Sequence, residues 1–138
     1  VSESRGLGDV YKRQVQWSWL EQKMASEVDH RVIVSSIQFL AMGHGWEAWK
    51  TMPHERQRLI DLIDTSSSDS VLFISGDRHR GGLYQLTSSS GKNIVEMTSS
   101  SLNLSFTNDE EASSSFVNDK FKLDDVISTI FFPEDEVN

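Results

Sequence analysis

Val71-Leu-Phe-Ile-Ser-Gly-Asp-Arg-His79 is the stretch of sequence that decides the fold. Its run of four apolar residues stops at a serine and a glycine, which is typical of a buried strand. Asp77 and His79 follow at the carboxyl end of that strand, where open α/β sheets place their ligand sites. An oxygen donor and an imidazole held there predict half of a metal site. Taken alone, the motif favours an ordinary alternative, in which Asp77 caps a turn and His79 is a partly buried surface residue.

Two elements before this stretch complete a parallel unit. The β-branched run Val32–Val34 predicts a second buried strand. Pro53 is expected in the first turn of a helix that continues to about residue 63. The buried face of that helix is expected to consist of Leu59, Ile60, Leu62 and Ile63. Two strands joined by such a helix form a βαβ unit, which implies parallel pairing and a layered α/β architecture.

A further helix is expected upstream, over roughly residues 15–28, because apolar side chains recur there at spacings of three and four. These side chains are Trp17, Leu20, Met24 and Val28. Downstream, residues 83–87 and 93–98 are short and partly alternating, and Gly91 lies between them, which predicts an antiparallel hairpin. The predicted fold class is therefore α/β, with a mixed sheet and helices packed on it.

The composition narrows the chemistry. The chain has 138 residues and no cysteine, so disulfides and thiolate ligands are excluded within it, and any metal must use nitrogen and oxygen donors. No run of about 18 apolar residues suggests a membrane span. The net charge of −8 comes mainly from residues 107–138, and nothing basic enough to follow a nucleic-acid backbone is present.

The two ends of the chain are expected to differ from its middle. Residues 1–14 show neither helical nor strand periodicity and look like translated adaptor sequence, so we expect a non-native segment there. Residues 15–104 carry the ordered pattern. Residues 105–138 are rich in serine and acidic side chains, and we expect a poorly defined tail with one short helix near residues 122–130.

Six blocks of this sequence, in order, resemble the C-terminal part of alkaline phosphatase D-like proteins, which belong to the calcineurin-like metallophosphoesterase superfamily. The blocks are Gln16–Glu21, Val32–Gln38, His44–Trp49, Glu55–Ile60, Leu72–His79 and Glu96–Asn103. Six blocks in sequence are far more specific than any one of them. The resemblance implies the C-terminal part of an α/β/β/α sandwich, hydrolysis of phosphate mono- or diesters by a metal-activated hydroxide, and a periplasmic or secreted location.

On that resemblance, Asp77 and His79 match the family's late Gly-Asp-x-His motif and carry over as metal ligands. The family implies two or more ions, calcium together with iron, while the two donor types also suit manganese or zinc. The family's early ligands lie upstream of anything in this chain. We therefore expect a fragment that is inactive alone and needs the missing N-terminal portion of the same domain. The competing hypothesis is a non-catalytic binding or interaction module with a vestigial Asp-His pair.

Two further residues are candidates for contact with the phosphate ester. His44 lies between two glycines in a loop after the first strand, where an imidazole is able to protonate a leaving group; the alternative is a solvated side chain. Arg80 carries a guanidinium that matches phosphate oxygens, with a plain surface charge as the alternative. Arg78 alternates with the two ligands and is expected to point away from them, into a structural ion pair.

Overall fold

The computed structural model describes residues 2–79 and 81–100, with side chains from residue 13 onward. In chain order the elements are α1 (Ser2–Met24), β1 (His30–Ser35), the 3-10 helix η1 (Trp49–Thr51), α2 (Pro53–Thr65), β2 (Ser70–Ser75), β3 (Gly81–Thr87) and β4 (Asn93–Ser99). The predicted strands, the hairpin and the helix that begins at Pro53 are confirmed. The predicted tail at residues 105–138, with its short helix, lies outside the described residues.

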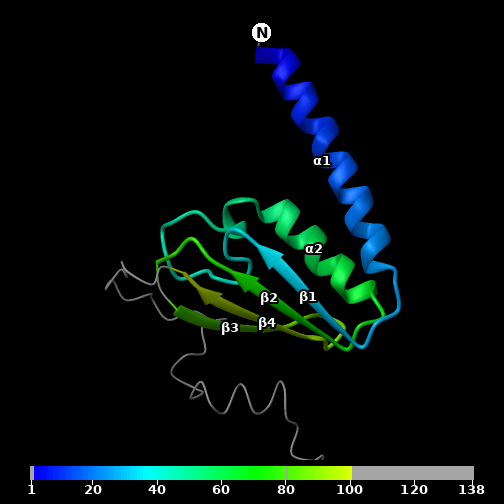
Figure 1. Cartoon of the computed structure of the whole chain (residues 1–138), viewed down its shortest axis with the longest axis vertical. Coiled ribbons are helices and arrows are strands. Elements are labelled where there is room, and N and C mark those ends of the chain that lie inside the picture. Colours follow the sequence, from blue (N-terminus) through cyan, green and yellow to red (C-terminus); the bar gives the residue numbers. More distant parts are fainter. Residues whose placement is uncertain (1, 80, 101–138) are drawn as a thin grey trace, which may run out of the picture.

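The strands form one mixed sheet in the order β1-β2-β4-β3. β1 pairs with β2 in parallel, and so does β4, whereas β3 and β4 form the antiparallel hairpin. Gly91 in the hairpin turn has a φ of 86°, a left-handed conformation that glycine adopts at little cost. Because β1, β2 and β4 run in the same direction, they end at one common edge of the sheet (Figure 1). The Gly-Asp-x-His motif lies at this edge.

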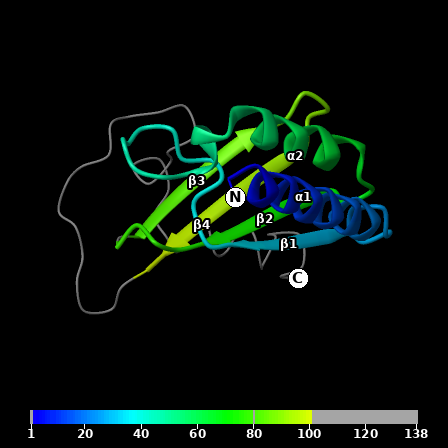
Figure 2. The ribbon, with the colours of Figure 1, turned by 90° about the horizontal axis from the view of Figure 1, so that it is seen from above.

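Helix α2 and the C-terminal part of α1 lie over one face of the sheet, while the N-terminal part of α1 extends away from it (Figures 1 and 2). Burial follows the alternation of the strands, since Val71 and Phe73 of β2 and Ile94 of β4 point toward the helices and are buried. The ring of Phe73 stacks on Phe39 with centroids 4.2 Å apart. Helix α2 contributes the buried side chains Leu59, Ile60 and Ile63, while Leu62 packs against the core from its margin. The predicted apolar face of α2 is therefore confirmed.

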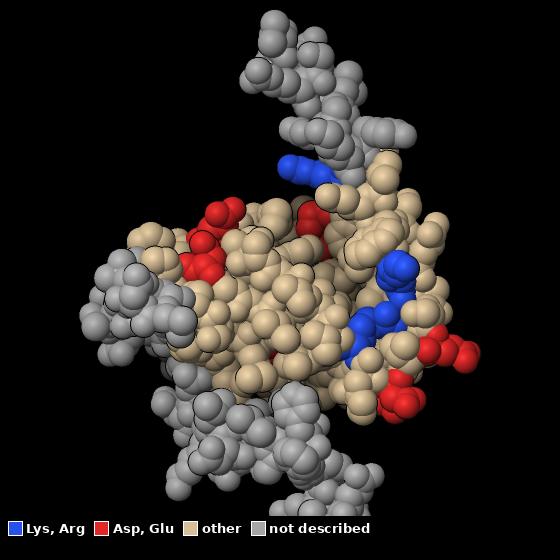
Figure 3. Space-filling view, viewed as in Figure 1, with Lys and Arg blue, Asp and Glu red and all other residues tan. Residues whose placement is uncertain are grey.

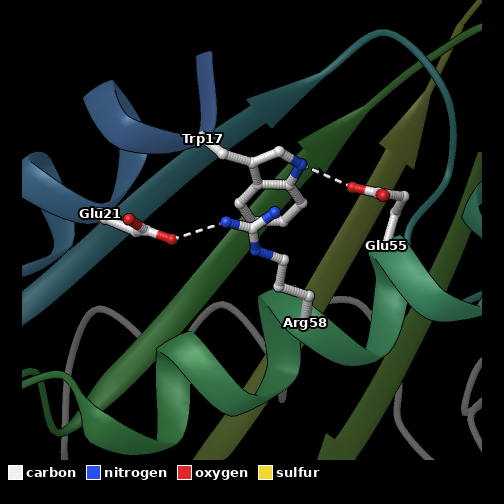
Figure 4. Close-up of polar contacts among 4 residues, drawn as sticks. All are labelled: Trp17, Glu21, Glu55 and Arg58. Carbon is white, nitrogen blue, oxygen red and sulfur yellow. Dashed lines mark hydrogen bonds and ion pairs between the residues drawn. The ribbon is translucent and has the colours of Figure 1, made fainter. Parts of the chain in front are cut away.

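Four side chains join α1 to α2 (Figure 4). The indole Nε1 of Trp17 donates to Glu55 Oε2 at 2.5 Å. The guanidinium of Arg58 lies 4.2 Å from the centre of the Trp17 ring and pairs with Glu21 at 2.8 Å. Trp17 is 9% exposed, whereas both members of the ion pair are 48% exposed. The shielded indole therefore contributes more to helix docking than the ion pair, because water weakens exposed pairs.

Two predictions about the first helix are wrong. α1 begins at Ser2, so it includes residues that lack an amphipathic pattern, and it ends at Met24 rather than near residue 28. Arg31 explains the early end, because its guanidinium donates to the carbonyl oxygens of Lys23 and Met24 in the last turn and of Ser26 just beyond it. Val28 consequently lies beyond the helix and is 39% exposed. That residues 1–14 are non-native stays a prediction.

The sheet face opposite the helices is apolar, and it is exposed along β1 and β2 but not at Leu83 of β3, which is 6% exposed. Val32 and Val34 of β1 are 58% and 77% exposed, and Ile74 of β2 is 43% exposed. The prediction of fully buried strands is therefore wrong for this face, because β1 is an edge strand and the strands bury mainly their helix-facing residues. One helical layer on one sheet is the α/β half of an α/β/β/α sandwich, in which a second sheet covers the other face.

Candidate functional site

Three chain segments meet at the edge where the parallel strands end (Figure 1). The turn Asp77–His79 follows β2, the loop of residues 36–48 follows β1, and Ser100 follows β4. The backbone N–H of His79 donates to Ser100 Oγ at 2.7 Å. The segment after β4 therefore helps to position the backbone of the turn Asp77–His79.

The turn itself has an unusual backbone. Asp77 and His79 have φ angles of 69° and 53°, and they are the described non-glycine residues with positive φ. The N–H of Arg78 donates to the carbonyl oxygen of Gly76 at 2.9 Å and so closes a tight turn. Left-handed side-chain residues cost about 1–3 kcal/mol each and concentrate at functional sites. In this turn Asp77 is exposed, His79 is half-buried and Arg78 is buried, and the predicted opposite orientation of Arg78 stays a prediction.

Asp77 and His79 fit a metal by donor type, because a carboxylate oxygen and an imidazole nitrogen suit calcium, iron, manganese or zinc. Two side chains are, however, too few ligands to hold a metal ion. Among the described residues, no three His, Asp or Glu side chains come together as a group able to hold an ion. Two donors alone do not form such a group within the described residues, so metal binding by Asp77 and His79 stays a prediction.

A carboxylate is buried beneath this edge. Glu96 of β4 is fully buried and accepts hydrogen bonds from the backbone N–H groups of Phe39 at 2.8 Å and Leu40 at 2.6 Å. Ser75 Oγ, at the end of β2, donates to it at 2.6 Å. Burial raises the pKa of the Glu96 carboxyl, and these donors oppose that shift. The carboxylate thus ties the loop after β1 to the sheet.

Arg56 of α2 supplies a positive charge near this carboxylate. Its Nε donates to the carbonyl oxygen of Phe39 at 2.9 Å, and its guanidinium lies 5.5 Å from the centre of the Phe39 ring. Burial lowers the pKa of Arg56, and the attraction of Glu96 works against that shift. The two charges therefore offset part of each other's desolvation cost.

His44 is connected to the same interior. Its Nε2 lies 2.8 Å from Oε1 of the buried Gln38, and its Nδ1 accepts the backbone N–H of Trp46 at 3.1 Å. Both ring nitrogens are therefore engaged in this conformation. Protonation of a leaving group by His44, which stays a prediction, requires the contact with Gln38 to open first.

The two arginines of the motif differ in outcome. Arg78 is 6% exposed, and its guanidinium carbon lies 5.7 Å from the centre of the Trp46 ring. The expected ion pair for Arg78 is not found within the described residues, where the aromatic ring is its neighbour instead. Arg80 lies outside the described residues, so its predicted contact with phosphate stays a prediction.

Other surfaces of the described chain do not compete with this edge. A groove of about 740 Å³ lies between α1 and β1 and is lined mainly by apolar and aromatic side chains, away from Asp77 and His79. Figure 3 shows one face on which charged side chains are scattered, with no continuous basic stripe. In the part of the chain that is described, no helix combines the length and apolar character needed to cross a membrane.

The sequence analysis does not identify Glu96 and Gln38 as site residues, although both interrupt apolar stretches with a polar side chain. Glu96 occupies a helix-facing position between Ile94 and Thr98 in a strand, and such an inward carboxylate needs partners. Gln38 interrupts an apolar run in the same way. What the pattern does not reveal is that the partners are backbone groups of a loop more than fifty residues away.

Comparisons with known proteins agree with this architecture. A family model described as PhoD-like phosphatase matches residues 12–128. A solved structure titled "Structure of PhoD" aligns with a TM-score of 0.52 and 22% sequence identity, over 61% of this chain. This chain covers 19% of the length of that protein, and the likeness shows the shared fold. No curated protein matches the sequence.

Proposed function

Because the chain belongs to the PhoD-like phosphatase family, we propose that it supplies two metal ligands, Asp77 and His79, to the active site of a phosphoric ester hydrolase. The substrate is a phosphate mono- or diester. The observation that carries the proposal is the pair of side chains held in left-handed conformation at the carboxyl end of β2. An exposed aspartate and a half-buried histidine in a strained turn are better explained by a ligand than by stability.

The metal site requires further ligands from another part of the domain. Calcium together with iron is the pair that the family implies, and manganese or zinc also suits the two donors. Metal ions of this kind polarise the phosphoryl oxygen and activate the attacking water. In this proposal Asp77 and His79 hold the ions. Ser100 supports them by accepting a hydrogen bond from the backbone of His79. Arg80 is proposed to contact the ester oxygens.

The chain alone is proposed to be inactive. We expect no hydrolysis of an aryl phosphate or a bis-aryl phosphate by the isolated 138-residue chain in the presence of calcium with iron, manganese or zinc. Joining residues 15–138 to the upstream portion of a PhoD-like phosphatase is expected to restore metal-dependent hydrolysis. Hydrolysis by the isolated chain would refute its proposed dependence on upstream ligands.

Variants of that chimera test the ligands. Asp77→Asn and His79→Gln are expected to lower activity by more than the roughly 10- to 100-fold that follows loss of an outer-shell partner. The matched controls are Asp61→Asn and His54→Gln, which change exposed residues of α2 and are expected to retain activity. Full activity of Asp77→Asn would refute the site. A folded, metal-loaded chimera without activity would instead favour the non-catalytic interaction module.

A further inference from the structure

A continuous chain of hydrogen bonds runs from the loop after β1 into the buried sheet. It begins at the backbone N of Trp46, 3.1 Å from His44 Nδ1. His44 Nε2 lies 2.8 Å from Gln38 Oε1, and Gln38 Nε2 lies 2.8 Å from Thr98 Oγ1. Thr98 Oγ1 lies 2.8 Å from Ser75 Oγ, which lies 2.6 Å from Glu96 Oε1. Each link has normal hydrogen-bond length.

The donor at one end of this hydrogen-bond series and the acceptor at the other end fix the direction of every hydrogen bond between them. A backbone N–H is always a donor, so Nδ1 of His44 is an unprotonated acceptor and the proton of the neutral ring lies on Nε2. Gln38 Oε1 must accept that proton, which leaves the Gln38 amide group to donate to Thr98. At the other end the carboxylate of Glu96 only accepts, so Ser75 donates to it and in turn accepts the proton of Thr98.

We propose that His44 is a positioning residue: as a neutral imidazole protonated on Nε2, it links Gln38 to the Trp46 backbone and so holds the Trp46 ring against Arg78. Arg78 lies between Asp77 and His79, and its guanidinium carbon is 5.7 Å from the centre of the Trp46 ring. Ser75, which lies between Thr98 and Glu96 in this series, is two residues before Asp77. The polar chain thus supports the ligand turn from two sides, a role that rests on the proposed function of that turn.

The tautomer of His44 is the first test, and it needs no substitution. In long-range ¹H–¹⁵N correlation spectra of the labelled 138-residue chain, we expect a protonated Nε2, an unprotonated Nδ1 and an Nε2–H resonance protected from exchange with water. The exposed His54 is the internal control and is expected to give no such protected resonance. Protonation of His44 on Nδ1 in the wild-type chain would overturn the proposal.

Substitutions at His44 separate its two contacts. Asn in His44→Asn places an acceptor near Nδ1 and is expected to keep the Trp46 N–H protected while losing the contact with Gln38. The longer amide of His44→Gln is expected to keep the contact with Gln38 and to lose the Trp46 contact. His44→Ala is expected to lose both, and with them the upfield ring-current shift that Trp46 imposes on the Arg78 Nε–H resonance. Trp46→Leu defines the unshifted position.

The last test changes Glu96, which lies at the buried end of the hydrogen-bond series. Glu96→Gln places an amide group at the accepting end, and we expect loss of the protected His44 Nε2–H resonance, whereas Glu47→Gln, in an exposed position, is expected to keep it. An unchanged Arg78 resonance in a folded His44→Ala chain would show that His44 does not hold Trp46, and would overturn the proposal. None of these readouts involves metal or ester, so they stand or fall separately from the hydrolase.

Discussion

Asp77 and His79 hold a backbone conformation that most side chains avoid. Their positive φ angles store strain that a structural turn would relieve by using glycine. We therefore expect the turn Asp77–His79 to lower the stability of the fold in order to present its side chains, as active-site residues often do.

Substitution of Asp77 by glycine tests whether the positive φ angle at this position lowers stability. Asp77→Gly is expected to raise the free energy of unfolding by about 0.5–1 kcal/mol, because glycine removes the left-handed strain at an exposed position. Urea unfolding measures the change. Asp69→Gly is the control, since Asp69 is also exposed but is not among the described residues with positive φ, and there glycine is expected to lower stability by about 0.5–1 kcal/mol. A loss of stability in Asp77→Gly contradicts the strain argument.

Glu96 is expected to contribute to stability through its acceptor oxygens. Glu96→Gln turns one acceptor into a donor that faces a backbone N–H, so we expect a loss of about 1–3 kcal/mol at neutral pH. Thermal and urea unfolding measure it. Glu47→Gln changes an exposed carboxylate in the same way and is expected to stay within about 0.5 kcal/mol of the wild type. Equal effects of the two substitutions would show that the buried bonds are not stabilising.

At the scale of elements, the hairpin turn between β3 and β4 docks on the end of α2. The hydroxyls of Ser89 and Ser90 donate to Asp64 at 2.5 Å and 2.8 Å. Hydrogen bonds from Ser88, Ser89 and Ser90 lower the pKa of Asp64 from 3.8 to about 2. Lys92 donates to the carbonyl oxygens of Ile63 and Ser66 at the same helix end.

This docking makes stability depend on pH. The pKa of Asp64 is lower in the folded chain than in the unfolded one, so its stabilising effect is present above pH 3.8 and is lost as the pH falls through about 2. The double variant Ser89→Ala and Ser90→Ala is expected to unfold at lower urea concentration than the wild type at pH 7 and at nearly the same concentration at pH 2. Ser18→Ala, which removes an exposed hydroxyl of α1, is the control and is expected to show the same difference from the wild type at both pH values. A difference that persists unchanged at pH 2 contradicts the linkage.

Local pattern predicted most elements well. The apolar run at 71–74, the helix start at Pro53 and the glycine turn at Gly91 each have a local physical cause that the sequence displays. The end of α1 was not predictable, because Arg31 from the following strand caps it through tertiary contact. The exposure of Val32 was missed because a run of β-branched residues looks the same in an edge strand and in a central one.

The candidate site also has a part that the sequence predicts and a part that it does not predict. Asp77 and His79 follow a strand within one short motif, so sequence identified them as candidate ligands, and the structure places them in one turn. The connection from Glu96 through Ser75, Thr98 and Gln38 to His44 joins three segments, which are β4, the end of β2 and the loop after β1. Only the folded sheet brings these side chains together, and no spacing along the chain encodes that.

At the scale of the whole molecule, the exposed apolar side chains of the edge strand β1 are expected to affect how the protein behaves in solution. Val34 is 77% exposed on the edge strand β1, and exposed apolar edge strands favour association between chains. Val34→Lys is expected to reduce concentration-dependent association in sedimentation velocity while changing the free energy of unfolding by less than about 0.5 kcal/mol. Ile94→Lys, on the buried face, is the contrasting variant and is expected to unfold the chain. Undiminished association of Val34→Lys would exclude this edge as its cause.

The place of β4 between β2 and β3 also sets the order in which the chain assembles. β3 and β4 are joined by residues 88–92 alone, and such hairpins close within about 1–10 μs. Pairing of β1 with β2 must instead close residues 36–69, a non-local step that is slower. The turn of Asp77 and His79 joins the β1-α2-β2 unit to the early hairpin. We therefore expect its geometry to form late, when the hairpin docks on β2, so that a chain arrested before that step would have its secondary structure without this turn.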